Sequence, residues 1–126
     1  MLHEDRYPFL NKGDYPMVVG ERRVTSDTLR PTHNPATGEE IGKAYLAGPH
    51  EVNLAVAIAQ EAFKVWSRLP PARREKLMLR YADLIEEHTD ELSFIDTLDN
   101  GAPLSGTRAG VTRAVAQLRL LCWLGN

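Results

Sequence analysis

Apolar side chains recur at every third or fourth position from Val52 to Trp66, and this stripe constrains the fold more than any other feature of the sequence. The spacing predicts an amphipathic α-helix with one continuous apolar face. Pro49 suits the first helical turn, and Glu51 complements the positive end of the helix dipole. The stripe consists of Val52, Ala55, Val56, Ala59, Ala62, Phe63 and Trp66.

Three more helices are predicted after this one. Pro71 begins the second helix, and Thr89 is expected to cap a short third helix that stops at Asn100-Gly101. The fourth helix is expected from about Thr107. The residues predicted to face inward are Leu77, Met78, Tyr81, Ala82 and Ile85 in the second helix, Leu92, Ile95 and Leu98 in the third, and Val111, Val115, Leu118 and Cys122 in the fourth, with Ala114 and Leu121 beside them.

The first 48 residues are rich in proline, glycine, threonine and β-branched residues, which favours short strands and turns. Gly20-Glu21 is expected to close a hairpin, and Asn34–Gly38 to form a turn in which Asn34 bonds the backbone ahead of it. The predicted strands are Met17–Val19, Arg22–Val24, Thr28–His33 and Ile41–Ala47, the last weakened by Gly42. Taken alone, the sequence predicts an α+β fold.

Composition excludes several classes of protein. At 126 residues the chain is one domain or part of one, and 43% apolar with 25% charged residues is typical of globular proteins. The longest apolar run, Leu120–Leu124, is too short to cross a membrane. A net charge of −2 gives no attraction to nucleic acid, and the N-terminus shows no targeting signal. A single cysteine, Cys122, fits a cytoplasmic protein.

No catalytic set emerges from the reactive side chains. The histidines lack metal-ligand spacing, no base follows Cys122, and neither zinc chemistry nor a cysteine nucleophile is supported. Gly101–Arg108 resembles a phosphate-binding loop, but Thr107 stands at the lysine position and a helix precedes the loop. The histidines are His3, His33, His50 and His88. Two groups of charged residues are interpreted as solvated surface. The acidic group is Glu86, Glu87, Asp90 and Glu91 around His88, and the basic group is Arg73, Arg74, Lys76 and Arg80.

Three stretches in order carry a family resemblance. They are NPATGE at Asn34–Glu39, FKVWSRLPPARREKLMLRYADLIEEH at Phe63–His88, and TLDNGAPL at Thr97–Leu104, where Ala102 replaces a more usual lysine. With this spacing, the chain from about Met17 to Asn126 resembles the N-terminal region of the aldehyde dehydrogenase superfamily. The resemblance implies the α/β fold of that family, of which this chain would hold the short strands and hairpin followed by about four helices.

The resemblance also implies a function for the longer family enzymes. They oxidise an aldehyde to a carboxylic acid with NAD or NADP, through a cysteine thiolate, hydride transfer and a glutamate-activated water, and they are homo-oligomers. All of those catalytic and cofactor-binding residues are expected beyond Asn126. Residues 1–15 are therefore expected to be an N-terminal arm and residues 16–126 an incomplete cofactor-binding domain, inactive alone, with the remainder of such a chain as its partner.

One site of the family carries over onto this sequence. Family members hold a structural monovalent cation, and the matching ligands are the Asp99 carboxylate and the backbone carbonyls of Thr32 and His33. Oxygen ligands suit K⁺ or Na⁺. The alternative is that Asp99 only accepts hydrogen bonds within its own turn.

Two further expectations concern helical surfaces. A non-catalytic helical interaction module derived from the family is the alternative function. The final helical turns carry apolar side chains on nearly every side, which predicts that the isolated chain self-associates or is only marginally folded, with Trp123 partly exposed in any monomer. These side chains belong to Leu118, Leu120, Leu121, Cys122, Trp123 and Leu124.

Overall fold

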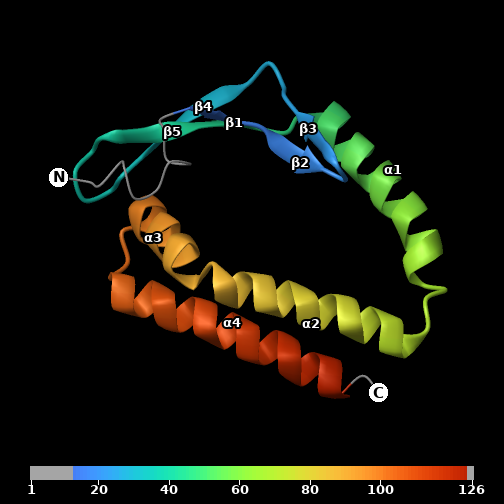
Figure 1. Ribbon diagram of the computed structural model, residues 1–126. Helices are drawn as coiled ribbons and strands as arrows, with labels where there is room; N and C mark the ends of the chain where they lie inside the picture. Colours follow the sequence, from blue (N-terminus) through green and yellow to red (C-terminus); the bar gives the residue numbers. More distant parts are fainter. Residues whose placement is uncertain (1–12, 125–126) are drawn as a thin grey trace. The chain divides into compact units, whose positions relative to one another are not determined.

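The computed structural model describes residues 13–124 (Figure 1). The chain divides into two compact units, Met1–Val65 and Trp66–Asn126. The first unit holds the strands and nearly all of the first helix, and the second holds the remaining helices. His3 and most of the predicted arm lie outside the described residues. The elements are β1 (Asp14–Tyr15), β2 (Met17–Val19), β3 (Arg22–Val24), β4 (Leu29–His33), β5 (Glu40–Tyr45), α1 (Pro49–Trp66), α2 (Pro71–Glu87), α3 (Thr89–Asn100) and α4 (Leu104–Leu124).

A three-stranded sheet in the order β1-β5-β4 forms the centre of the first unit. β4 runs antiparallel to β5, and the register shifts between Thr32 and His33. β1 pairs parallel with β5, which the sequence did not predict because two residues leave no period. Gly42 does not break β5. It admits the Tyr15 ring, with which a side chain at this position would collide.

The Asn34 turn between β4 and β5 forms as predicted. Asn34 is buried, and its Oδ1 accepts a hydrogen bond from the Ala36 amide at 2.9 Å. Its carbonyl accepts the Gly38 amide at 2.8 Å, with Gly38 in the left-handed region at φ 75°. Local hydrogen bonding therefore fixes this turn without distant contacts.

The hairpin of β2 and β3 and the helix α1 also match the sequence pattern. The Gly20 turn lies against α1, since a Cβ at Gly20 would stand 3.1 Å from the Ile58 Cγ2. α1 begins where the Glu51 carboxylate accepts the Gly48 amide at 2.8 Å. Its predicted stripe is nevertheless largely exposed, with Phe63 64% accessible.

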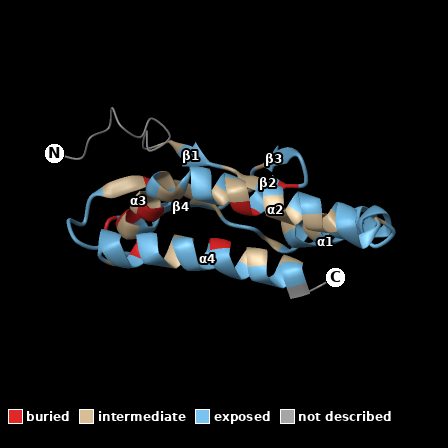
Figure 2. Cartoon of the chain, turned by 60° about the horizontal axis from the view of Figure 1, so that its bottom comes forward, coloured by how far each residue is buried: buried red, intermediate tan, exposed pale blue. Residues whose placement is uncertain are grey.

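The second unit packs α4 along both α2 and α3. Its buried apolar residues are Ala82 on α2, Leu98 on α3 and Val115 on α4 (Figure 2). Ala82 is 0% exposed, and its small side chain permits close approach of the facing helix. Two polar residues, Ser93 and Thr107, complete this narrow core.

Two helix starts differ from the prediction. α4 begins three residues before Thr107, because the Pro103 carbonyl accepts the Gly106 and Thr107 amides at 2.8 and 3.1 Å. Thr89 does not cap α3 but is its first residue, and its hydroxyl donates backward to the Glu86 carbonyl at 2.8 Å. The predicted end of α3 is correct, with Gly101 at φ 77° closing the helix.

Several residues predicted to face inward are instead exposed. Leu77 and Tyr81 are 43% and 54% exposed, because α2 turns Met78, Ala82 and Ile85 inward. On α3 the buried positions are Ser93 and Leu98, which rotates Leu92 outward. On α4 the predicted face is correct, with Val115 buried and Val111, Leu118 and Cys122 half-buried, but Ala114 and Leu121 are exposed.

Candidate functional site

The stretch resembling a phosphate-binding loop forms a connection between two helices. Gly101 ends α3, and Gly106 lies in the first turn of α4. Thr107 is buried, and its Oγ1 lies 3.0 Å from both the Ser93 carbonyl oxygen and the Thr97 Oγ1. The hydroxyl therefore ties α4 to α3, in place of the phosphate contact that a lysine would make in the loop.

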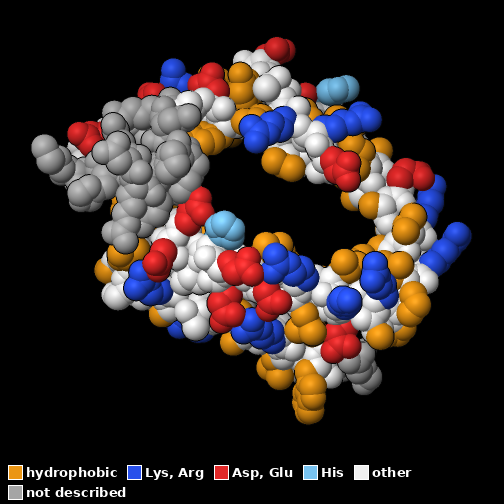
Figure 3. All heavy atoms as spheres, in the orientation of Figure 1, with side chains coloured by type: hydrophobic (Ala, Val, Ile, Leu, Met, Phe, Trp, Pro, Cys, Tyr) orange, Lys and Arg blue, Asp and Glu red, His pale blue; other side chains and the backbone are white. Residues whose placement is uncertain are grey.

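The acidic group around His88 consists of ion-paired carboxylates at the junction of α2 and α3. Three of its carboxylates pair with arginines of the second unit and the fourth contacts the His88 ring, and acidic and basic side chains are interspersed over α2 and α4 (Figure 3). The pairs are Arg80–Glu87, Arg119–Glu86, Arg108–Asp90 and His88–Glu91.

Arg119 makes the most extensive of these contacts. Its guanidinium donates to Glu86 at 2.6 Å and to Asp83 at 2.8 Å, so one cation of α4 bridges two carboxylates of α2. The hydrogen bonds to Glu86 and Asp83 raise the pKa of Arg119 above its ordinary value. Because arginine is already charged at every physiological pH, the contact orients the two helices and offers no proton-transfer chemistry.

The three residues of the predicted cation site belong to two units, Thr32 and His33 to the first and Asp99 to the second. Thr32 and His33 end β4, at the point where the register with β5 shifts. Asp99 lies in the last turn of α3 and is exposed. The hydrogen bond that closes this turn goes from the Ala102 amide to the Asn100 Oδ1 at 2.7 Å, so Asn100 takes the turn-forming role that was considered for Asp99.

No cluster of three or more histidine, cysteine, aspartate or glutamate side chains within residues 13–124 could hold a metal ion. That finding concerns side-chain ligands, whereas two of the three predicted ligands, those of Thr32 and His33, are backbone carbonyl oxygens. The Thr32, His33 and Asp99 site therefore stays a prediction.

Cys122 lines a pocket of about 450 Å³ between the first turns of α2 and the last turns of α4. Among the described residues, the pocket lining contains no histidine or lysine that could act as a base. Arg74 lies in the lining, but its Nη1 donates to the Leu69 carbonyl at 2.7 Å. The residues of this pocket are Trp66, Pro71, Arg74, Glu75, Met78, Leu118, Leu121 and Cys122.

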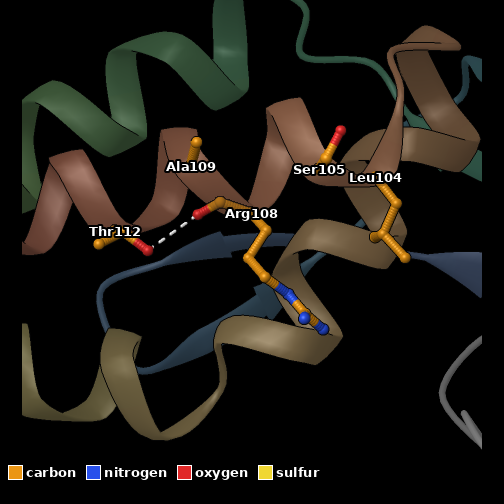
Figure 4. Close-up of a pocket in the computed structure, with 5 residues that line it drawn as sticks. All are labelled: Leu104, Ser105, Arg108, Ala109 and Thr112. Atoms are coloured by element: carbon orange, nitrogen blue, oxygen red, sulfur yellow. Dashed lines mark hydrogen bonds between the residues drawn. The ribbon is translucent and has the colours of Figure 1, made fainter.

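A second pocket, of about 670 Å³, lies along one face of α4 (Figure 4). Its described lining comes from this helix alone: Leu104, Ser105, Arg108, Ala109 and Thr112. Arg108 is paired with Asp90, and the Thr112 hydroxyl donates to the Arg108 carbonyl at 3.0 Å. Both polar groups therefore have partners within their own unit, and sequence reasoning had singled out neither residue as a functional one.

Apolar side chains reach the surface along α1 and near the end of α4 (Figure 3). Trp123 is 73% exposed, Leu121 66% and Leu120 54%, as expected for Trp123 from the sequence. None of the helices in the described part of the chain is long and apolar enough to span a membrane.

Comparison with known proteins assigns these elements to one family. The family model described as "Aldehyde dehydrogenase family" matches residues 23–125. A putative aldehyde dehydrogenase-like protein of Schizosaccharomyces pombe is 40% identical over 103 residues, which covers 81% of this chain and 21% of that protein. The 5-carboxymethyl-2-hydroxymuconate semialdehyde dehydrogenase of Escherichia coli is 43% identical over 90 residues, or 71% of this chain and 19% of that protein.

Solved structures show the same correspondence. HpcC from Thermus thermophilus superposes with a TM-score of 0.88 and 35% identity, covering 94% of this chain and 24% of its own. The NAD⁺ complex of an aldehyde dehydrogenase from Bacillus cereus gives a TM-score of 0.87 and 29% identity, covering 97% of this chain and 26% of its own. The present chain thus spans about a fifth to a quarter of the length of these relatives.

Proposed function

Because the chain belongs to the aldehyde dehydrogenase family, we propose that residues 16–126 form the N-terminal part of the cofactor-binding domain of an NAD(P)-dependent aldehyde dehydrogenase. Residues 1–15 are proposed to be an arm that precedes this domain. The observation that carries the proposal is the match over residues 23–125 to proteins of which this chain covers only a fifth to a quarter.

We propose further that the 126-residue chain does not oxidise aldehydes on its own. Family chemistry needs a thiolate nucleophile, a base and a bound nicotinamide. Cys122 lies in a largely apolar pocket, and His88 is engaged with Glu91 at 2.8 Å, so neither residue is arranged for that chemistry. In this proposal the chain contributes packed helices, and the remainder of a family chain contributes the catalytic and cofactor-binding residues.

Two assays test the proposal. The purified chain, mixed with NAD or NADP and a panel of aliphatic and aromatic aldehydes, is expected to produce no NADH or NADPH. Turnover that Cys122→Ser abolishes would contradict this expectation. In the second assay the chain is fused to the E. coli relative in place of the matching N-terminal segment. The fused protein is expected to oxidise its semialdehyde, and a folded but inactive fusion would count against the family role.

The exposed apolar residues of α1 and α4 support a second candidate function, a non-catalytic helical interaction module. The coding sequence that follows Asn126 distinguishes the two. A continuation that encodes a catalytic cysteine and a cofactor loop favours the dehydrogenase, whereas a stop codon shared by independent sequences favours the module. A cytoplasmic location is proposed for either, on the evidence of the single cysteine.

A further inference from the structure

We propose that Asn100 is a site of spontaneous deamidation, and that opening of the last turn of α3 controls how fast it reacts. The sequence contains one Asn-Gly pair, Asn100-Gly101, and a following glycine hinders the reaction least because it has no side chain. Both residues are exposed to the water that the reaction consumes. They form the boundary between α3 and its left-handed cap.

The reaction needs water and no cofactor. The Gly101 backbone nitrogen gives its proton to solvent and attacks the Asn100 Cγ, and the side-chain amide takes a proton from water and leaves as ammonia. The new bond between the Gly101 nitrogen and the Asn100 Cγ closes a five-membered cyclic imide. Water then opens the imide at either carbonyl, which yields aspartate or isoaspartate at position 100. The net change consumes water, releases ammonia and exchanges no electrons.

Three hydrogen bonds of the closed turn oppose this attack. The Gly101 amide donates to the Thr97 carbonyl at 3.0 Å, so its proton is held within the helix. The Asn100 side chain is held at both ends, since its Nδ2 donates to the Asp96 Oδ1 at 2.6 Å and its Oδ1 accepts the Ala102 amide at 2.7 Å. Attack on the Asn100 Cγ therefore requires that these bonds break.

The turn can open without unfolding the rest of the second unit. All three bonds lie within residues 96–102. Leu98, which is 7% exposed, anchors α3 before the turn, and the first turn of α4, which the Pro103 carbonyl closes, anchors the chain after it. Asp99 and Asn100 between these anchors are exposed. A helix end with so few buried contacts opens at a lower free energy than the core, so its opening sets the rate.

Deamidation places a carboxylate where an amide closes the helix. The new charge would stand at the C-terminal end of α3, where the helix dipole disfavours negative charge and the last turn holds no basic residue. It would follow Asp99 directly and face Asp96, whose hydrogen-bond donor is lost. Isoaspartate also adds a methylene group to the main chain before Gly101. Both products are therefore expected to loosen the end of α3, and the change is irreversible because the ammonia is lost.

The test measures the rate of deamidation at Asn100 in the 126-residue chain. The chain is incubated at mildly alkaline pH and digested, and the aspartate and isoaspartate peptides are separated and quantified by mass spectrometry. The same incubation in concentrated guanidinium chloride gives the rate of the open turn. The folded chain is expected to react at least about tenfold more slowly. Asn34 is the internal control, because Pro35 has no N–H that could attack and no product should form there.

Two substitutions on α4 separate opening of the turn from unfolding of the whole unit. Gly110→Ala should make global unfolding about two- to fivefold rarer, since a Cβ there meets nothing within 4 Å. Val115→Ala shortens a side chain that is 3% exposed and should make global unfolding roughly tenfold more frequent. Because neither residue belongs to the α3 turn, both variants are expected to deamidate at the wild-type rate. Should Val115→Ala fail to fold, Gly110→Ala decides the same question.

Asp99→Lys is the matched variant within the turn. The helix dipole favours a cation at the C-terminal end of α3, so the folded variant is expected to deamidate about two- to fivefold more slowly, with no change in guanidinium chloride. Three results would overturn control by the turn: equal rates in the folded and unfolded wild type, rates that follow the global stability of the α4 variants, or an unchanged rate in Asp99→Lys. An Asn100 that stays intact in guanidinium chloride would overturn the site itself.

A stability measurement tests the effect of the product. Asn100→Asp carries the charge of the deamidated chain and is expected to lower the melting temperature by about 2–6 °C. Asn53→Asp makes the same change near the start of α1, where the helix dipole favours negative charge, and is expected to cause no loss. An Asn100→Asp variant as stable as the wild type would overturn the loosening of α3.

Discussion

The buried hydroxyl of Thr107 joins α4 to α3 by hydrogen bonds, so replacing Thr107 with valine isolates the contribution of these bonds. Thr107 is 4% exposed, and valine has nearly the same shape. The Oγ1 lies 3.0 Å from the Ser93 carbonyl, 3.0 Å from the Thr97 Oγ1 and 3.1 Å from the Leu104 carbonyl. Because two of these partners can only accept, the consistent arrangement has Thr97 donating to Thr107 and Thr107 donating to a carbonyl.

The expected loss of unfolding free energy follows from these bonds. A neutral hydrogen bond contributes about 1 kcal/mol net, and a partly buried hydroxyl left without its acceptor adds to the cost. Thr107→Val is therefore expected to destabilise the chain by about 1–2 kcal/mol. For a unit the size of Trp66–Asn126, each kcal/mol lowers the melting temperature by roughly 4–8 °C.

Urea denaturation followed by circular dichroism measures the loss. Thr107→Ser is the matched control, because it keeps the hydroxyl and removes only a buried methyl group, which costs about 1 kcal/mol. A double-mutant cycle with Thr97→Val should give a coupling energy of about 0.5–1 kcal/mol. A valine variant as stable as the wild type, or a coupling energy of zero, would refute the reasoning.

Two further predictions address a helix end and the cation site. Gly101→Ala is expected to lower the free energy of unfolding by about 1 kcal/mol, since φ at Gly101 is 77°. Gly110→Ala in the interior of α4, where a Cβ meets nothing within 4 Å, should raise it by about 0.5–1 kcal/mol in the same denaturation assay. Equal effects of the two substitutions would contradict the assigned conformations. Replacing K⁺ by choline should lower the melting temperature of the chain, by the equivalent of about 1.4 kcal/mol if K⁺ stood at ten times its Kd, and Asp99→Asn should abolish the difference; a variant that keeps it would exclude Asp99 as a ligand.

Local signals in the sequence were enough to predict most elements. Asn34 and Gly38 define their turn through bonds to near neighbours, and Pro71 and Gly101 mark helix ends through backbone geometry that needs no partner. β1 was missed because its pairing with β5 depends on residues about thirty positions away. Short strands held by distant partners leave no periodic pattern of their own.

Which side of a helix is buried proved harder to predict than the helix itself. Period alone places Leu77 and Ala82 on one broad stripe, but the approach of α4 selects Ala82 and leaves Leu77 exposed. Ser93 and Thr107 escaped prediction because a polar residue is buried only when another helix supplies its hydrogen-bond partners. The pocket beside Cys122 likewise depends on two helices that are distant in sequence.

The connectivity of the second unit bears on the order of events during synthesis. α3 and α4 are neighbours in the chain, and α2 precedes them directly, so all contacts among these helices are made within one unit, Trp66–Asn126. Small helical units fold in about microseconds to milliseconds, whereas ribosomes add about 5–20 residues per second. The three helices can therefore assemble within the time needed to add a single residue after α4. In a longer family chain, they would stand ready as a folded template before the residues that follow them emerged.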